Sequence, residues 1–214
     1  FRTFGSEVYV VEMMPHILPT MDSEAALTLQ KILIKDGISI HVNTVVNKFE
    51  KSDEGIVAYL SNGSKISVDK VVVAVGRRPN TNDLGLESVG VALGKRGEVL
   101  VNEHMETNVP GIYAAGDVAG KYFLAYTAFE EGIIAAENAL GINSTVNYSA
   151  LPIAIFTEPE VASVGLTEEE ARKLGDVKVG KFPFIANGRA LTLGSYEGFI
   201  KVIADKNDRI LGAH

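Results

Sequence analysis

Thr107-Asn108-Val109-Pro110-Gly111-Ile112-Tyr113-Ala114-Ala115-Gly116-Asp117 is the stretch of this sequence that says most about its fold. It predicts a turn, then a short buried strand, then a glycine and a carboxylate at the carboxyl end of that strand. Ligands of open α/β sheets bind beyond the strand ends, where a glycine lets backbone approach the ligand and an Asp accepts hydrogen bonds from sugar-type hydroxyls. Read by itself, Asp117 could instead cap the helix that follows.

The residues before this stretch alternate between strand and helix patterns. An apolar run over 7–12 predicts a buried strand, a helix begins at Asp22 and ends near Gly37, and 38–42 predicts the next strand. Four further strands are expected over 45–51, 55–60, 65–68 and 70–75, with a hairpin turn at 61–63. The run 71–75 shows no alternation, so we expect both of its faces to be buried in a parallel sheet.

A loop over 76–82 is rich in turn residues, and we interpret it as a hinge between two domains. A strand near 98–101 and a helix over 124–140, capped by Gly141, complete the middle of the chain. Further on, strands are expected over 161–165, 177–183, 198–204 and from 209 onward. Thr167-Glu168-Glu169-Glu170 opens a helix that ends near Gly175. This last part predicts an α+β layer.

The composition excludes several classes of function. A net charge of −7 over 214 residues gives no basic surface for nucleic acid or an anionic membrane. No apolar run approaches the roughly 20 residues that span a bilayer. The absence of cysteine excludes disulfide, thiolate-metal and thiol chemistry within this chain. Residues 1–5 resemble the last turn of a helix and 209–214 a strand in progress, so we expect a segment of a longer polypeptide.

Two further positions are candidates for binding. Glu12 ends the first strand, where a carboxylate can accept hydrogen bonds from ribose hydroxyls, although a solvated strand end is the alternative. Gly76 follows the buried run 71–75, where it could let backbone touch a nucleotide, or it could belong to a basic surface turn. The four histidines, at positions 16, 41, 104 and 214, lack the spacing of metal ligands, and we interpret them as incidental.

Three motifs in order resemble one known family, the FAD-dependent pyridine nucleotide-disulfide oxidoreductases. They are the flavin fingerprint over 107–117, the domain-crossing sequence Val73-Ala74-Val75-Gly76-Arg77-Arg78-Pro79-Asn80-Thr81, and the segments 158–171 and 182–190, which resemble the start of the dimerisation domain. The resemblance implies an α/β fold in three parts. These are an incomplete Rossmann-like NAD-binding domain over 1–75 whose Gly-rich turn is missing, the second segment of an FAD-binding domain over 76–148, and the start of an α+β dimerisation domain over 149–214.

The resemblance also implies which residues contact the cofactors. Residues that would contact NAD are Glu12, Val46 and Gly76, and those that would contact FAD are Gly116, Asp117, Leu124 and Ala125. Glu12 favours NAD over NADP, because a carboxylate repels a 2′-phosphate. The residues of these motifs are most similar to those of the dihydrolipoamide-oxidising branch of the family. There is one departure, because Tyr126 stands where that branch usually has a His beside the flavin.

The implied activity is oxidation of dihydrolipoamide to lipoamide, with electrons passing through FAD to NAD. We expect no catalytic and no metal-ligating residue here, because the redox cysteines would lie upstream and the His-Glu base downstream, so this chain alone would be inactive. The expected partners are a second copy, bound through the C-terminal domain, and a lipoyl-bearing protein or small dithiol as substrate, with no nucleic acid or membrane. The expected location is the cytoplasm, or the mitochondrial matrix in a eukaryote. The alternatives are a mercuric reductase, a soluble transhydrogenase, a glutathione-reductase-like enzyme, or a non-enzymatic binding or dimerisation module.

Overall fold

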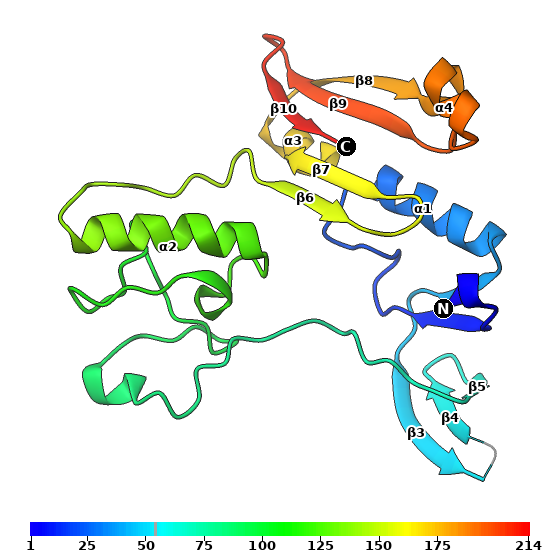
Figure 1. Cartoon of the computed structure of the whole chain (residues 1–214), viewed down its shortest axis with the longest axis horizontal. Coiled ribbons are helices and arrows are strands. Elements are labelled where there is room, and N and C mark those ends of the chain that lie inside the picture. The colour runs from blue at the N-terminus through cyan, green and yellow to red at the C-terminus, as the bar shows by residue number, and fades with distance from the viewer. Residues whose placement is uncertain (54) are drawn as a thin grey trace. The chain divides into compact units, whose positions relative to one another are not determined.

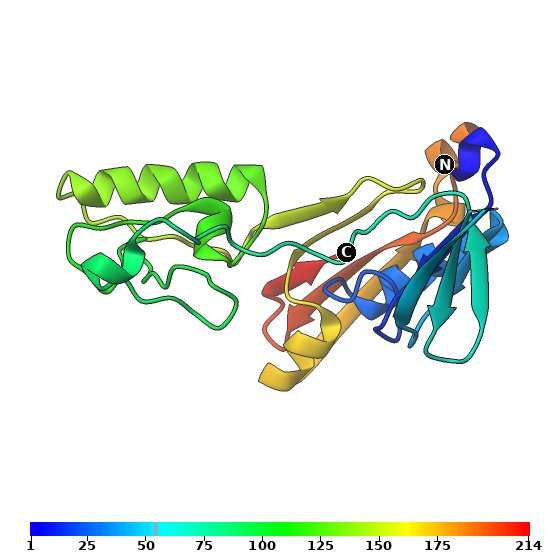
Figure 2. The same ribbon diagram turned by 90° about the horizontal axis from the view of Figure 1, so that it is seen from below.

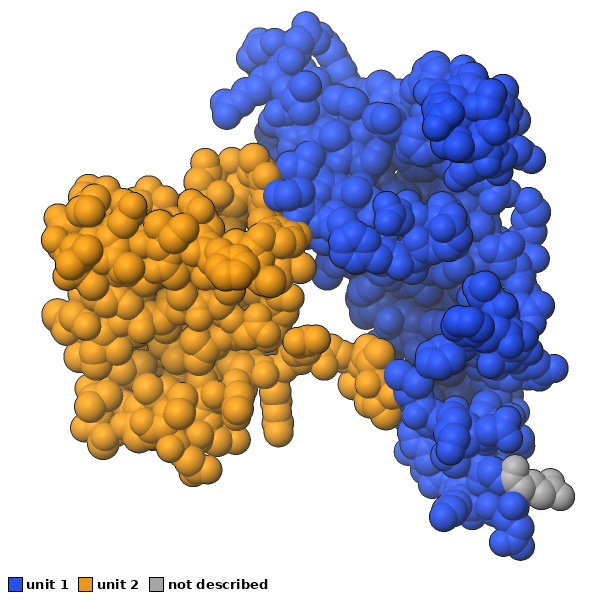
Figure 3. All heavy atoms as spheres, in the orientation of Figure 1, with its two compact units in different colours: residues 1–72, 152–214 blue, residues 73–151 orange. Residues whose placement is uncertain are grey.

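The computed structural model describes residues 1–53 and 55–214, which form two compact units. Unit 1 contains residues 1–72 and 152–214, and unit 2 contains residues 73–151 (Figure 3). Most of the first and third predicted ranges therefore belong to one compact unit, while 73–75 and 149–151 belong to the other. The domain boundaries 1–75, 76–148 and 149–214 stay a prediction.

Unit 1 begins with a β-α-β arrangement. Strand β1 (Val8–Val11) pairs in parallel with β2 (Ile38–His41), and helix α1 (Ser23–Lys35) connects them (Figure 1). The helix begins where predicted, because the Asp22 carboxylate accepts hydrogen bonds from the N–H groups of Glu24 and Ala25. The predicted helical turn at the N-terminus is a short 3-10 turn, η1 (Arg2–Phe4), closed by Gly5 at φ +92°.

A three-stranded antiparallel sheet follows in the order β3 (Val46–Ser52), β4 (Gly55–Leu60), β5 (Lys65–Val68). The hairpin turn lies where predicted, and Gly63 adopts a φ of +87° that favours glycine. Alternate residues of β4 and β5, namely Ala58, Leu60 and Ile66, form a small buried cluster on one face.

The C-terminal part of unit 1 is the predicted α+β layer. Its five antiparallel strands lie in the order β6-β7-β10-β9-β8. Their bounds are β6 (Pro152–Ile155), β7 (Val161–Gly165), β8 (Val177–Pro183), β9 (Phe199–Asp205) and β10 (Ile210–Ala213), with α3 (Glu168–Leu174), η4 (Phe184–Ala186) and α4 (Gly188–Leu193) between them. The capping box between Thr167 and Glu170 is confirmed. Within this unit α1 contacts both β2 and β7, and α3 contacts β9 (Figures 1 and 2).

Unit 2 is built around one long helix, α2 (Ala125–Ala139). Its C-cap is Leu140, one residue before the prediction, and Gly141 follows at φ +82°. Two 3-10 turns, η2 (Leu86–Val89) and η3 (Gly116–Ala119), interrupt the loops that make up the rest of the unit, and η3 contacts α2.

Three predicted strands do not form. Residues 70–75 are irregular, and Val75 is 92% exposed where we expected burial on both faces. The stretches 98–101 and 112–115 contribute only isolated bridges, Leu93 with Val99 and Glu106 with Tyr113. A strand exists only where a neighbour exchanges backbone hydrogen bonds with it, and within the described residues no strand lies alongside these three. These stretches have the composition of strands, but the described residues offer them no sheet to join.

Candidate functional site

Glu12 is held in a defined position at the end of β1. Its backbone N–H donates to the carbonyl of His41 at 2.9 Å, and its Oε1 accepts a hydrogen bond from the N–H of Met14 at 2.9 Å. A carboxylate has about four acceptor positions, so this one bond leaves capacity for a pair of ribose hydroxyls. The geometry therefore fits the sequence-based role of Glu12.

Val46 lies close to the same end of the β-α-β arrangement. The N–H of Thr44 donates to the carbonyl of Glu12 at 3.0 Å, which joins the segment before β3 to the end of β1. Val11 and Val46 both pack against the cluster formed by Ala58, Leu60 and Ile66. The structure thus brings two of the three predicted NAD contacts together.

Gly76, the third predicted NAD contact, belongs to unit 2 and is described apart from Glu12 and Val46. Its φ of +111° is a conformation that side chains disfavour, yet a Cβ built on it would meet no atom within 4 Å. Glycine is needed here for its backbone conformation and not to relieve crowding, which leaves room for a ligand to approach.

Gly116 and Asp117 form a sharp turn, here called the fingerprint turn. Gly116 is buried at φ +78° and starts η3, while the Asp117 side chain remains 51% exposed. Asp117 Oδ2 lies 4.0 Å from Arg77 Nη1, a weak and largely solvated ion pair. Asp117 therefore does not cap α2, whose N-cap is Leu124, and its carboxylate is available to hydroxyl groups.

The start of α2 forms the other side of this site. Leu124 makes no side-chain capping hydrogen bond, and the first turn contains no acidic residue. The first N–H groups of a helix lack partners within the helix and carry a partial positive charge, so they suit an electronegative ligand atom. Thr127, one turn in, is 3% exposed, and its hydroxyl has no partner among the residues that the structure describes. A polar ligand with acceptors and hydroxyls fits this donor set.

Sequence reasoning missed two residues beneath the fingerprint turn. The Gly116 N–H donates to Glu131 Oε2 at 2.6 Å, and the Tyr148 hydroxyl donates to Glu131 Oε1 at 2.6 Å. Burial, reinforced by the hydrogen bond to Glu131, holds the pKa of Tyr148 well above its usual range, so the phenol keeps its proton. The helical period could have revealed Glu131, because it shares the buried face of α2 with Thr127 and Ile134.

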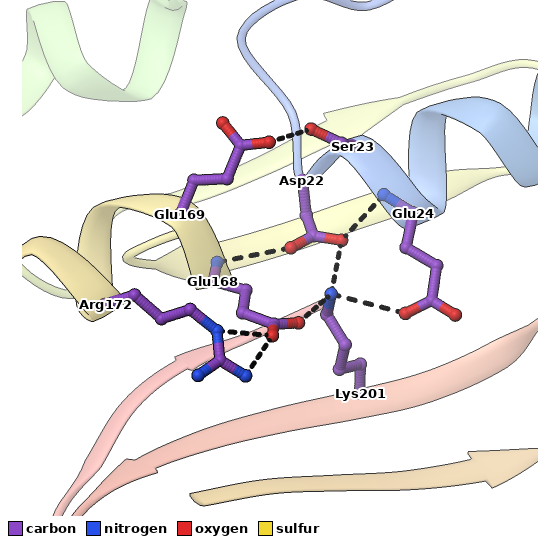
Figure 4. Close-up of a pocket in the computed structure, with 7 residues that line it drawn as sticks. All are labelled: Asp22, Ser23, Glu24, Glu168, Glu169, Arg172 and Lys201. Atoms are coloured by element: carbon purple, nitrogen blue, oxygen red, sulfur yellow. Dashed lines mark hydrogen bonds and ion pairs between the residues drawn. The ribbon is translucent and has the colours of Figure 1, made fainter. Parts of the chain in front are cut away.

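A second polar cluster lies in unit 1, in a pocket of about 250 Å³ (Figure 4). The Lys201 side chain is 2% exposed and its Nζ lies 2.8 Å from Asp22, 2.9 Å from Glu168 and 3.4 Å from Glu24. Burial alone would lower the pKa of Lys201, but the hydrogen bonds to Asp22 and Glu168 outweigh it and raise that pKa. Arg172 pairs with Glu168 at 2.6 Å and Lys181 pairs with Glu24, so three cations in all face these three carboxylates. We interpret the cluster as a structural connection between α1, α3 and β9.

The histidines contact backbone or aromatic groups. A ring N–H of each of His16, His104 and His214 donates to a backbone carbonyl oxygen at 2.8–3.0 Å, and His41 stacks on Tyr9 with ring centroids 6.5 Å apart. In the described ranges, 1–53 and 55–214, no group of three or more metal-type side chains is arranged to hold an ion. In the same ranges, no helix combines the length and apolar character needed to cross a bilayer.

Two family models match the chain. The pyridine nucleotide-disulphide oxidoreductase model covers residues 1–132, and the dimerisation domain of the same family covers residues 151–214.

Several curated relatives of similar sequence are dihydrolipoyl dehydrogenases. A dihydrolipoyl dehydrogenase from Thermus scotoductus is 51% identical over 99% of this chain, and a mitochondrial dihydrolipoyl dehydrogenase from Pisum sativum is 43% identical over 98% of it. The match spans 47% and 43% of those relatives, so the chain has about half their length.

Solved structures agree on the fold. The HOCl-induced flavoprotein disulfide reductase RclA from Escherichia coli, in its Cu(II) complex, superposes with a TM-score of 0.90 at 30% identity, covering 99% of this chain and 50% of that one. LpdA from Mycobacterium tuberculosis superposes with a TM-score of 0.90 at 29% identity, covering 99% of this chain and 47% of that one.

Proposed function

Because the chain belongs to the pyridine nucleotide-disulphide oxidoreductases, a family of enzymes that use FAD and NAD, we propose that it is part of a flavoprotein that oxidises dihydrolipoamide. The observation that carries the proposal is the fingerprint turn beside the uncapped start of α2, which is a donor and acceptor set suited to a flavin nucleotide. In the overall reaction dihydrolipoamide and NAD⁺ give lipoamide, NADH and a proton. FAD, when bound, relays the two electrons between dithiol and nicotinamide.

The residues of this chain would bind and orient the cofactors. The Asp117 carboxylate accepts hydrogen bonds from hydroxyls of the flavin's ribityl chain. The backbone N–H groups near Leu124 and Ala125 donate to electronegative atoms of the same cofactor, and the positive end of α2 favours negative charge there. Gly116 allows the turn to come close to the ligand.

On the nucleotide side, Glu12 would accept hydrogen bonds from the adenosine ribose, with Val46 beside it. The same carboxylate would repel a 2′-phosphate, which selects NAD over NADP. Gly76 would let the backbone at the end of 71–75 approach the nicotinamide half of the ligand.

The C-terminal part supports a homodimer. The match to the dimerisation domain over 151–214 carries this step. Several large apolar side chains in this part are exposed, namely Phe182, Ile185, Leu191, Leu193, Tyr196 and Ile200. Exposed apolar side chains of this kind are typical of a protein interface. The substrate would be a lipoyl group on a protein or a small dithiol, and the location the cytoplasm, or the mitochondrial matrix in a eukaryote.

A second candidate keeps the fold and changes the substrate. The high TM-score to a flavoprotein disulfide reductase that is induced by HOCl supports it, because one fold can serve different substrates. The higher sequence identity to dihydrolipoyl dehydrogenases favours the first candidate.

The test is steady-state kinetics of the complete protein that contains this chain. We expect NAD-dependent oxidation of dihydrolipoamide, with little activity on oxidised glutathione. The reverse preference would move the protein to another branch of the family. The Asp117→Ala variant should bind FAD about tenfold more weakly, the loss expected for a charge-assisted hydrogen bond. Unchanged FAD affinity would remove Asp117 from the flavin site.

A further inference from the structure

We propose that Glu131 is a positioning residue that fixes the fingerprint turn in the geometry in which Asp117 meets the flavin. The inference rests on the proposed function, because it concerns how the chain holds the same cofactor. Glu131 lies on the face of α2 that packs against η3, and none of the sequence motifs includes it.

The contacts of Glu131 are suited to this role. Its side chain is 1% exposed, and each carboxylate oxygen accepts one hydrogen bond at 2.6 Å, Oε2 from the Gly116 N–H and Oε1 from the Tyr148 hydroxyl. A buried carboxylate with two donors is held more tightly than one with a single donor, because its rotation would break both bonds. Tyr148 thus orients Glu131, and Glu131 orients Gly116.

The hydrogen bond to Gly116 determines where Asp117 lies. It fixes the peptide plane that precedes Gly116, while the φ of +78° directs the chain into the 3-10 turn. The turn is then closed by the Gly120 N–H, which donates to the carbonyl of Asp117 at 3.1 Å. Asp117 is the next residue after the fixed plane, so a shift of Glu131 moves the Asp117 carboxylate directly.

A positioning role of Glu131 and a purely structural role predict different changes in FAD affinity. We would prepare the complete protein with Glu131→Gln, Glu131→Asp and Glu131→Leu, remove FAD, and measure the Kd for FAD by flavin fluorescence, together with the melting temperature of each apoprotein. Glu131→Gln keeps the length of the side chain and one acceptor for Gly116, while its amide can donate to the Tyr148 oxygen. Glu131→Asp keeps the charge but withdraws the carboxylate by about 1.5 Å, one C–C bond.

If position matters, Glu131→Gln should raise the Kd for FAD by less than about threefold, whereas Glu131→Asp and Glu131→Leu should raise it about tenfold, as expected when a buried N–H loses its acceptor. The opposite order, with Gln worse than Asp, would mean that charge and not placement matters, and would overturn the proposal. The Gln and Asp variants settle this even if the Leu variant does not fold.

Asn138→Ala is the matched control, because Asn138 lies on the same helix and donates to the carbonyls of Ile134 and Ser144 at 2.8 Å, away from Gly116. We expect it to lower the melting temperature without changing the Kd for FAD. If FAD affinity follows melting temperature equally across Asn138→Ala and the Glu131 variants, Glu131 is merely structural.

Asp117→Ala separates the two proposals. If it leaves the Kd unchanged, the flavin role of the fingerprint turn is wrong. If it weakens FAD binding while the Glu131 variants do not, only the role of Glu131 is wrong.

Discussion

Replacing Lys201 by Met should destabilise the protein strongly, because it leaves three carboxylates around an apolar side chain of similar length. Met fills most of the space of the lysine stem, so the change tests charge and not volume. The carboxylate of Asp22 is 3% exposed and would keep its charge without a cation beside it. The other two partners, Glu24 and Glu168, are partly exposed and can turn toward water.

The expected loss of unfolding free energy follows from this difference in burial between Asp22 and the other two carboxylates. Removing one partner of a buried ion pair costs about 3–5 kcal/mol. We expect the lower end, about 3 kcal/mol, since Asp22 keeps hydrogen bonds from the N–H groups of Glu24 and Glu168 and two of the carboxylates can rehydrate. For a cooperative unit of 150–250 residues this lowers the melting temperature by about 6–12 °C.

The assay is thermal unfolding of the complete protein at neutral pH, followed by intrinsic fluorescence and by circular dichroism. Lys35→Met is the matched control, because Lys35 also pairs with a glutamate, Glu197, at 2.7 Å, but its side chain is 72% exposed. We expect the control to melt with the unchanged protein, because exposed ion pairs add little to stability. If Lys201→Met lowers the melting temperature no more than Lys35→Met does, the cluster of Figure 4 does not hold α1 to β9 in solution.

Three further predictions concern pH and the cofactor sites. Burial alone would raise the pKa of Asp22, but Lys201 and the Glu168 N–H outweigh it and lower that pKa. A carboxylate with a lowered pKa stabilises the fold above its unfolded pKa and loses that effect as the pH falls through the folded pKa. The difference in unfolding free energy between the unchanged protein and Lys201→Met should therefore shrink below about pH 4, as measured by urea titrations. Glu12→Arg should shift the ratio of kcat/KM for NADPH over NADH upward by about tenfold, and an unchanged ratio would exclude Glu12 from the ribose site. Gly116→Ala should cost about 1–2 kcal/mol from its left-handed conformation, and its Cβ would also lie 3.0 Å from that of Ala128, so it should both lower the melting temperature and weaken FAD binding.

The sequence predicts well those elements that depend on local contacts. Helices α1 and α3 begin directly after their N-caps, Asp22 and Thr167, because the side chain of each cap accepts hydrogen bonds from the first turn, and such caps are visible in the sequence. The hairpin at Gly63 and strands β4, β5, β7 and β8 also lie where the pattern indicates. Strand β6 and helix α4 were missed, since short segments with Pro and Gly carry little periodic signal.

The wrong predictions concern stretches whose structure depends on a pairing partner and not on local contacts. The runs over 70–75 and 112–115 have strand composition, but a strand requires a neighbour that no local pattern reveals. Their backbone is irregular in the structure because the described residues offer them no paired edge. The same distinction applies to the site: Glu12 and Asp117 could be named from motifs, whereas Lys201 could not, because its partners lie on α1 and α3, far away in the chain.

The two buried clusters differ in what their charges require. Lys201 places a cation beside three carboxylates of the same unit, so its ion pairs lie entirely within unit 1. We therefore expect the loss of Lys201 to affect stability alone. Glu131 is a carboxylate that accepts hydrogen bonds from two neutral donors, the N–H of Gly116 and the hydroxyl of Tyr148. Such an arrangement fixes the direction of the carboxylate, because each oxygen accepts from one donor. Stability and cofactor affinity should therefore separate between the two sites: Lys201→Met lowers the first, and Glu131→Asp lowers the second.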